Sequence, residues 1–441
     1  MIGCPRWWFL ACLAGLISRP VSGEDWPQWL GPKRDSVWRE TGIIEKFPQD
    51  GPKILWRTPI SGGYAGPAVA SGRVYVADFV AEGDTTPNPN KRSDRKGIER
   101  LLCLDAKTGQ VLWKHEHETT YKISYDYGPR CTPTVSGGKV YALGAEGRLC
   151  CLDAKSGDEV WSHDFTSDYK VATPMWGFAG HPLVDGQKLI CLVGGKGSVA
   201  VAFDKDTGKE LWRALDAPDP GYCAPSIIEA GGTRQLLIWH PLAVNGLDPE
   251  TGKVFWSIEL KPDYGMSIQI PRKLGDLLFV GGIGMQCVCL KLHPDKPTVD
   301  EAWRGDIKTG LFPVNSTPFL EDGILYGCCT KGELRGVKLD SGVRLWETFQ
   351  PTTNKRPAQS GSGTAFLVKN GDRFFLFSET GDLIIAKLSP AGYEEISRAH
   401  LIEPTQNGFG RDVIWSHPAF AEKCVFARND KEIVCASLAA E

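Results

Sequence analysis

Several features that would assign a function directly are missing from this sequence. After the first 23 residues, no apolar stretch approaches the length needed to span a membrane. Lys and Arg number 50 against 53 Asp and Glu, a net charge of −3, so we expect no binding of nucleic acid. There is no Gly-x-Ser-x-Gly nucleophile elbow. The only closely spaced histidines, His115 and His117, are expected at a strand end, and we predict no metal site.

Long polar or single-residue tracts are also absent, so the chain should be folded nearly throughout. Its 441 residues exceed what one hydrophobic core organises, which indicates several domains or a modular array. The 50 glycines, 30 prolines and 15 tryptophans favour the array.

The first 23 residues have the pattern of a signal peptide. Arg6 supplies the charged start, residues 7–17 form a short apolar run, and residues 21–23 are small. Cys12 lies too early in that run for a lipoprotein cleavage box, so we expect no lipid anchor. The sequence therefore predicts an exported protein of the periplasm or cell envelope, without a transmembrane segment.

A degenerate repeat runs through the rest of the chain. Its common form is small-x-Asp-x-x-Ser/Thr-Gly-x-x-x-Trp, and the four segments that align without gaps are Cys103-LDAKTGQVL-Trp113, Cys151-LDAKSGDEV-Trp161, Ala202-FDKDTGKEL-Trp212 and Gly246-LDPETGKVF-Trp256. Weaker copies end at Trp346 and Ile396, a longer one ends at Trp303, and Trp56 resembles an isolated end of the same unit. Eight markers, 43 to 57 residues apart, indicate a propeller rather than separate domains.

Each unit has the pattern of four short strands. In the second unit, residues 132–135, 139–144, 148–153 and 159–164 alternate with turn residues. The Asp-x-x-Ser/Thr-Gly segment should close the hairpin between the third and fourth strands. We expect the recurring indoles to pack against the neighbouring blade, and these docking tryptophans are Trp56, Trp113, Trp161, Trp212, Trp256, Trp303 and Trp346.

The two ends of the chain supply the last blade. Three strands are expected within residues 416–438, and residues 53–58 provide the missing fourth, which removes exposed sheet edges. The predicted fold is all-β: an eight-bladed β-propeller of four-stranded antiparallel blades, the last closed by the N-terminal strand. We expect an N-terminal extension over residues 24–52 and the propeller domain over residues 53–441.

The repeat resembles the tryptophan-docking repeat of pyrroloquinoline quinone (PQQ) dehydrogenases, and equally that of BamB-like propellers of bacterial outer-membrane assembly. The resemblance covers most of residues 53–438. The segment Asp25-WPQWLGP, followed by Asp35-SV, is similar to the N-terminal segment of secreted BamB-like propellers. The motif is specific for the fold and weakly specific for function.

The resemblance to the dehydrogenases implies a quinone in the channel, a calcium ion held by acidic or amide ligands, and a disulfide between adjacent cysteines. Cys150 and Cys151 lie inside an expected strand, where adjacent side chains face opposite sides. Cys328 and Cys329 lie near a turn, and a disulfide between them stays open. Cys103 and Cys151 share a slot that other blades fill with Ala or Gly, which favours packing over disulfide bonding.

The segments that lead into the innermost strands should form one rim of the channel. Most combine an aromatic residue, a glycine and a proline, and the residues expected to converge there are Arg130, Trp176, His181, Tyr222, Asn315, Arg411, Trp415 and His417. An aromatic, concave mouth is the usual place for a ligand or peptide. The same residues could instead only plug the channel and set the turns.

The sequence therefore favours a non-catalytic, BamB-like binding scaffold that uses its rim loops to bind envelope proteins or peptides. We expect a monomer without a cofactor. Two alternatives stay open: a PQQ-dependent dehydrogenase with calcium, and a polysaccharide-binding propeller whose aromatic rim stacks on sugars.

Overall fold

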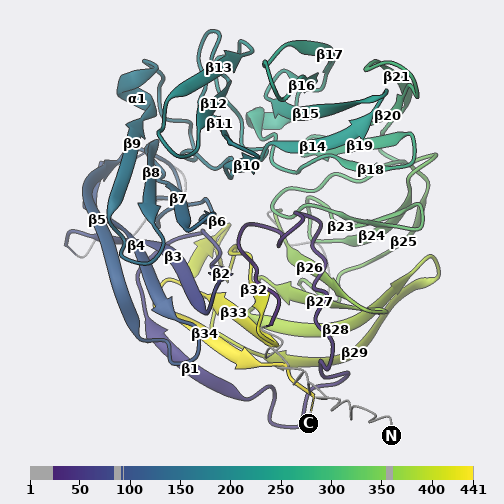
Figure 1. The fold of residues 1–441 in the computed structure, drawn as a ribbon. Coiled ribbons are helices and arrows are strands. Elements are labelled where there is room, and N and C mark those ends of the chain that lie inside the picture. Colours follow the sequence, from purple (N-terminus) through teal and green to yellow (C-terminus); the bar gives the residue numbers. More distant parts are fainter. Residues whose placement is uncertain (1–22, 84–90, 93, 354–360, 441) are drawn as a thin grey trace, which may run out of the picture.

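The computed structural model describes residues 23–83, 91–92, 94–353 and 361–440. Cys12 and the expected signal peptide, except Gly23, lie outside the described residues. In the described part the chain forms eight four-stranded antiparallel sheets around a ring (Figure 1). The prediction of an eight-bladed propeller is confirmed.

Seven blades are simple meanders in which four consecutive strands pair in order. Blade 1 consists of β2 (Ala68–Ala70), β3 (Arg73–Ala81), β4 (Arg95–Asp105) and β5 (Val111–Tyr121), and blade 2 of β6 (Thr134–Ser136), β7 (Lys139–Leu143), β8 (Arg148–Asp153) and β9 (Glu159–Asp164). Blade 3 consists of β10 (Leu183–Asp185), β11 (Lys188–Leu192), β12 (Ala200–Asp204) and β13 (Glu210–Ala214). Blade 4 consists of β14 (Ser226–Ala230), β15 (Thr233–His240), β16 (Ala243–Leu247) and β17 (Val254–Glu259). Blades 5 to 7 consist of β18 (Arg272–Leu274), β19 (Leu277–Gly282), β20 (Gln286–Leu292) and β21 (Val299–Arg304); β22 (Phe319–Glu321), β23 (Ile324–Cys328), β24 (Leu334–Lys338) and β25 (Arg344–Thr348); and β26 (Ala365–Asn370), β27 (Arg373–Ser378), β28 (Asp382–Ser389) and β29 (Gly392–His400).

Blade 8 joins the two ends of the chain. It combines β32 (Ala419–Ala421), β33 (Cys424–Arg428) and β34 (Glu432–Ser437) with β1 (Ile54–Pro59), which pairs antiparallel with β34. Trp56 lies opposite Cys435, in the register that joins Trp113 to Cys103 in blade 1. The predicted closure by the N-terminal strand is confirmed.

Among the described residues, few elements lie outside the blades. They are the hairpin β30 (Gln406–Gly408) and β31 (Arg411–Val413), the single turn α1 (Phe165–Asp168) and a 3-10 turn at Asp263–Gly265. No helix in the described residues has the length and apolarity to cross a membrane.

The repeat motif forms the turn between the third and fourth strands of a blade. In blade 1, Asp105 Oδ1 accepts hydrogen bonds from the amides of Lys107 (3.0 Å) and Thr108 (2.9 Å). The Thr108 hydroxyl donates to the same oxygen at 2.9 Å. Gly109 follows with a φ of +71°, a conformation that favours glycine.

The marker indoles lie between blades. Six of them donate Nε1–H to a carbonyl of the next blade at 2.8 to 3.3 Å, and the pairs are Trp56 with Ala106, Trp113 with Ala154, Trp161 with Lys205, Trp212 with Pro249, Trp303 with Leu339 and Trp346 with Ser389. Each acceptor directly follows the Asp position of the repeat. The same turn therefore connects the third and fourth strands of its own blade and accepts the hydrogen bond from the indole of the preceding blade.

Trp256 departs from this pattern. The next blade carries extra residues between β20 and β21, from His293 to Thr298. The Trp256 Nε1–H donates to Gln235 Oε1 of its own blade at 2.7 Å instead.

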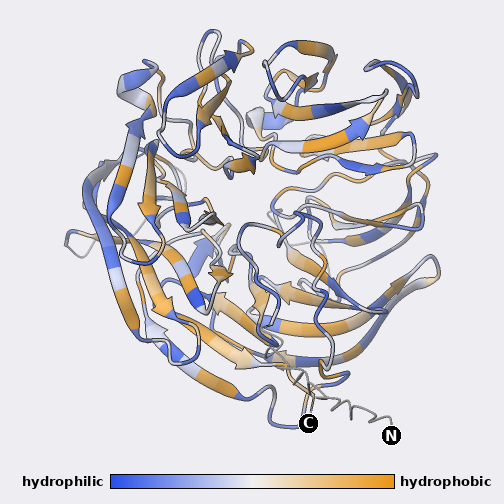
Figure 2. Cartoon of the chain, in the orientation of Figure 1, coloured by the Kyte–Doolittle hydropathy of each residue, from blue (hydrophilic) through white to orange (hydrophobic). Residues whose placement is uncertain are grey.

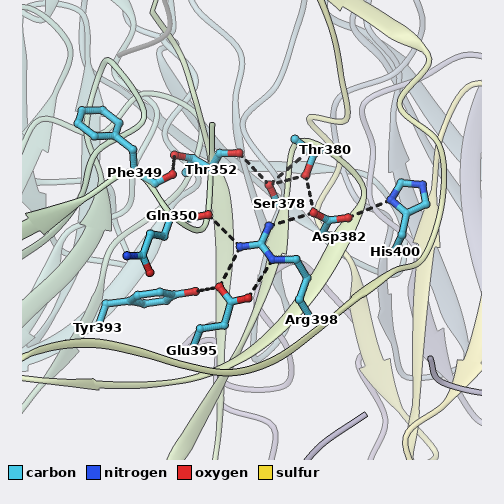
Figure 3. Close-up of polar contacts among 10 residues, drawn as sticks. All are labelled: Phe349, Gln350, Thr352, Ser378, Thr380, Asp382, Tyr393, Glu395, Arg398 and His400. Atoms are coloured by element: carbon cyan, nitrogen blue, oxygen red, sulfur yellow. Dashed lines mark hydrogen bonds and ion pairs between the residues drawn. The ribbon is translucent and has the colours of Figure 1, made fainter. Parts of the chain in front are cut away.

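A polar network joins the segment after blade 6 to blade 7 (Figure 3). Arg398 of β29 donates to Gln350 O at 2.9 Å, to Asp382 Oδ2 at 3.0 Å and to Glu395 Oε1 at 3.0 Å. Asp382 also pairs with His400 Nδ1 at 2.9 Å. Because Gln350 follows β25, this network fixes the chain where it leaves blade 6.

Burial follows strand position within each blade. The middle strands β11 and β12 are almost wholly buried, whereas the outermost strand β13 is mostly exposed. Figure 2 shows the same contrast in hydropathy between the middle strands and the outer strands and loops. The core therefore consists of apolar layers between adjacent blades.

The N-terminal extension crosses the ring and contacts blades that are distant in sequence (Figure 1, purple). Trp26 bridges to Val69 of β2, and Val37 bridges to Lys369 of β26. Trp38 is fully buried. This segment therefore contacts the innermost strands of blades 1 and 7.

The prediction that His115 and His117 lie at a strand end was wrong. In blade 1, β4 begins at Arg95 and pairs with β3 as far as Ala81 opposite Gly97. The equally long strand β5 pairs with β4, so His115 and His117 lie inside β5. Both strands continue past the usual blade length.

Candidate functional site

The segments that lead into the inner strands surround a cavity of about 760 Å³ at one mouth of the channel. Among its lining residues are seven of the eight predicted rim residues, namely Arg130, Trp176, His181, Tyr222, Asn315, Trp415 and His417. No described Asp or Glu lines it. The fold thus brings seven of the eight predicted residues to one cavity, where they make up a third of the lining residues.

Aromatic side chains form the mouth of this cavity. The ring centroids of Tyr125, Phe409 and Trp415 lie 5.9 to 6.5 Å apart. Across the mouth, the rings of Trp176 and Tyr222 meet edge to face at 5.8 Å.

Some of the apolar surface around the mouth is open to solvent. Tyr264 is 77% exposed, Phe409 46% and Met175 44%, and all three line the same cavity. Exposed apolar groups gathered at one concave place mark an interaction surface more often than a folding requirement.

The floor of the cavity comes from the N-terminal extension. Trp29 stacks on His181 with centroids 4.5 Å apart and an interplanar angle of 11°. The same indole meets His417 edge-on at 5.6 Å. The sequence analysis missed Trp29, because no repeat connects the Asp25-WPQWLGP segment to the channel; its paired tryptophans were the only signal.

Both histidines of the floor are neutral at pH 7. Burial lowers the pKa of His417 to about 3. Burial, with a smaller contribution from the Arg34 cation, lowers the pKa of His181 well below its ordinary value. Since His181 Nδ1 accepts from the Thr132 amide at 3.0 Å, its proton lies on Nε2.

Arg130 is held by its own loop. Its guanidinium donates to the carbonyls of Ser124 (2.9 Å), Tyr125 (2.6 Å) and Gly128, and lies 5.1 Å from the centre of the Tyr64 ring. These bonds fix the loop between β5 and β6 at the cavity wall.

Arg411 lies behind the rim rather than on it. Its Nε donates to Glu379 Oε1 at 2.9 Å, and the Trp415 indole donates to Glu379 Oε2 at 3.1 Å. Glu379 is 2% exposed. Arg411 therefore fixes the carboxylate that positions Trp415, a role that could not be inferred from its place beside Gly410 in the sequence.

The cavity does not fit the quinone and calcium of the dehydrogenase alternative. Calcium takes six to eight oxygen ligands, usually including carboxylates, and none of the described carboxylates lines the cavity. Cys328 and Cys329 are free, buried thiols, and Cys329 Sγ accepts from the Phe312 amide at 3.2 Å. Neither cysteine is among the lining residues.

A possible metal-ligand cluster lies elsewhere, between blades 1 and 2. Ligand atoms of His115, Cys150 and Glu159 all lie within 4.8 Å of one another. Arg148 already pairs with Glu159 at 2.9 Å. A guanidinium on the shared carboxylate disfavours a second cation there.

The chain is similar to known propellers. The sequence model of the family described as outer membrane protein assembly factor BamB matches residues 97–270 and 242–441. BamB from Moraxella catarrhalis has a TM-score of 0.54 and 16% identity over 87% of this chain and 98% of that one. Quinohemoprotein alcohol dehydrogenase from Comamonas testosteroni has a TM-score of 0.60 and 14% identity over 95% and 81%.

The computationally designed Ika8 protein has a TM-score of 0.51 and 9% identity over 87% of this chain and 99% of that one. No curated protein matches significantly. At these identities the likeness to solved structures concerns the fold alone.

Proposed function

The chain belongs to the family described as outer membrane protein assembly factor BamB, and from that premise we propose that it is a non-catalytic binding scaffold of the cell envelope. Its partner is a protein or peptide that inserts an apolar side chain into the aromatic cavity. The family description supports protein partners and an exported location.

One observation carries the proposal: exposed aromatic and apolar groups gather around a cavity that the fold holds rigidly. Tyr264, Phe409 and Met175 stand at the mouth, while Arg130 and the Arg411–Glu379 pair fix the loops behind them. Aromatic anchors that enter a preformed pocket supply most of the binding energy in many protein interfaces.

The chemistry of the lining supports binding rather than catalysis. The two floor histidines have strongly lowered pKa values, and within the described residues no carboxylate lines the cavity to act as a base. Arg130 is engaged by three carbonyls. The cavity therefore lacks the paired acid and base that hydrolysis or oxidation needs.

Site-specific photocrosslinking in intact envelopes tests this proposal. A photoreactive phenylalanine analogue at position 264 or 409 should capture a discrete partner. The matched control is position 307, because Ile307 is 73% exposed but lies away from the cavity. Equal capture at 264 and 307, or none at 264 and 409, would contradict the proposal.

The quinone-dependent alternative has a direct test. Purified protein mixed with PQQ and Ca²⁺ should keep no quinone absorbance after desalting and should show no dye-linked alcohol oxidation. Retention of the quinone together with turnover would replace the scaffold proposal with an oxidoreductase.

A further inference from the structure

We propose that the cavity binds a carboxylate carried on an aromatic or apolar body, with the carboxylate at the floor beside Trp29 and Thr132. This inference rests on the proposed function of the cavity as a binding site and specifies the chemistry of what enters it. The group could belong to a small aromatic acid or to the C-terminal residue of a peptide.

Hydrogen-bonding groups at the floor lack partners. Trp29 Nε1 and Thr132 Oγ1 are buried and make no hydrogen bond within the described residues, in side chains that are 4% and 2% exposed. The Tyr64 hydroxyl on the wall is also buried and unpaired there. A buried hydrogen-bonding group without a partner destabilises a fold, so three around one cavity indicate a function.

A ligand that pairs with these groups must supply hydrogen-bond acceptors. An indole N–H can only donate, and the neutral His181 offers a further N–H at Nε2 because Nδ1 already accepts from the Thr132 amide. The hydroxyls of Thr132 and Tyr64 can donate as well. A carboxylate is the one common group that offers several acceptor sites and no donor.

The charge beneath the floor favours an anion. Arg34 is buried below His181, where it donates to the carbonyls of Pro182 and Pro225. Arg272 is half-buried beside it and donates to Pro318 O at 2.8 Å and to Arg34 O at 3.1 Å. Neither guanidinium has a carboxylate within 4.0 Å in the described part of the chain.

Both guanidinium groups stay charged at neutral pH, since burial lowers the pKa of Arg34 and of Arg272 only to about 10. The nearest acidic influence on Arg272 is Asp35, which is itself paired with Arg39. Two cations without a direct ion-pair partner beneath the floor stabilise an incoming anion.

The side chains of the cavity walls determine which body can carry the carboxylate. Above the floor the cavity is lined by Trp176, Tyr222, Ile268, Ile283 and Trp415, which suit a ring or a branched apolar group. Its volume of about 760 Å³ is that of a small-ligand site. It holds one aromatic acid or the last one or two residues of a peptide.

Isothermal titration calorimetry with four probes tests the inference. The probes are 3-phenylpropionate, its primary amide, an N-acetylated tripeptide ending in Phe with a free carboxylate, and the same peptide as a C-terminal amide. At least one acid should bind about tenfold or more tightly than its amide, which corresponds to one charge-assisted hydrogen-bond set. Tight binding of 3-phenylpropionate alone indicates a small acid, and tight binding of the peptide acid indicates a chain end.

Matched variants locate the carboxylate. Trp29→Phe keeps the ring and removes only the N–H, and Thr132→Val removes only the hydroxyl, so each should weaken acid binding about five- to tenfold. Trp113→Phe removes an inter-blade N–H far from the cavity and should bind as the unmodified chain does. If one floor variant fails to fold, the other still provides the test.

The inference would be overturned by amides that bind as tightly as acids, and also by floor variants that bind acids normally. Absence of binding by all four probes while crosslinking at position 264 persists would refute the carboxylate and leave the scaffold proposal standing. Acid binding without any crosslinking at position 264 or 409 would support the carboxylate site and contradict the scaffold proposal.

Discussion

Gly208, in the turn between β12 and β13, illustrates how much one residue of the repeat decides. Its φ is +74°, and a Cβ there would lie 2.7 Å from the Trp161 ring of the preceding blade. The turn glycine therefore meets two demands, a left-handed backbone and close approach of an indole. The sequence motif indicated the first demand and could not show the second.

We expect Gly208→Ala to lower the free energy of unfolding by roughly 2 to 4 kcal/mol, the sum of backbone strain and overpacking. The matched control is Gly186→Ala, whose φ of +58° is also left-handed but whose Cβ meets nothing within 4 Å. Gly186→Ala should lower the free energy of unfolding by only about 1 kcal/mol. Urea denaturation followed by tryptophan fluorescence measures both, and equal losses would mean that indole contact adds nothing.

Glu99 makes stability depend on pH in an unusual direction. This residue of β4 is 6% exposed and accepts hydrogen bonds from the Tyr121 hydroxyl and the Ala145 amide. Burial raises its pKa from 4.5 to about 7, although both hydrogen bonds act to lower it. The folded state therefore binds this proton more tightly than the unfolded state, and the resulting stability is lost as the pH rises through 7.

Replacement by glutamine isolates this effect. Between pH 5 and pH 8 the unmodified chain should lose about 2 to 3 kcal/mol more stability than Glu99→Gln. The floor histidines titrate in both proteins, so their contribution cancels in the difference. Parallel stability curves for the two proteins across this pH range, measured by urea denaturation, would show that Glu99 is not protonated in the folded state at pH 5.

At the scale of elements, the blades were predictable because each is a local meander. The turn signals and the marker residue recur every 43 to 57 residues, so strand order and closure followed from spacing alone. The path of residues 24–47 was not predictable in this way. Its contacts are single long-range pairs, such as Trp26 with Val69 and Val37 with Lys369, and no periodic signal encodes them.

The same distinction between repeated and non-repeated segments explains which residues of the candidate site were predicted. Seven rim residues were found because equivalent loops of successive blades converge on one mouth. Trp29 and the role of Glu379 behind Arg411 were missed, since both depend on how segments far apart in sequence meet. Repeats predict the scaffold of this site, whereas its floor depends on the non-repeated segment.

Blade 4 shows how an insertion is compensated. The extra residues after β20 remove the usual carbonyl, and Gln235 accepts from Trp256 in its place while donating to Ala230 O at 2.9 Å. Gln235→Met keeps the shape and leaves the buried N–H unpaired, which should cost about 1 to 3 kcal/mol. In a double-mutant cycle measured by urea denaturation, Trp256→Phe should cost much less in the Gln235→Met background; full additivity would show that the bond contributes nothing.

The whole molecule depends on closure, because each blade buries apolar surface against two neighbours. In blade 8 the last of these surfaces is completed by β1, which covers the edge of β34 and inserts Trp56 against blade 1. A propeller without β1 would expose both an unpaired strand edge and the site of a buried indole. Such an edge invites pairing with another chain.

Three chains that begin at different residues separate the effect of ring closure by β1 from the effect of the N-terminal extension. A chain that begins at Glu24 keeps both, one that begins at Gly51 keeps only β1, and one that begins at Ser61 has neither. Loss of the extension removes Trp38, a fully buried side chain, so the chain from Gly51 should melt at a lower temperature than the chain from Glu24 but stay monomeric. The further loss of β1 and of the Trp56 packing should lower the melting temperature by about 10 °C or more.

Self-association is the sharper readout, because only the chain from Ser61 presents β34 as a free edge. Light scattering after size exclusion should show monomers for the first two chains and dimers or larger species for the third. If the chain from Ser61 were monodisperse and melted with the chain from Gly51, β1 would be an accessory strand and the ring would be stable with seven complete blades. Association of the chain from Gly51 as well would instead assign the protective role to the extension.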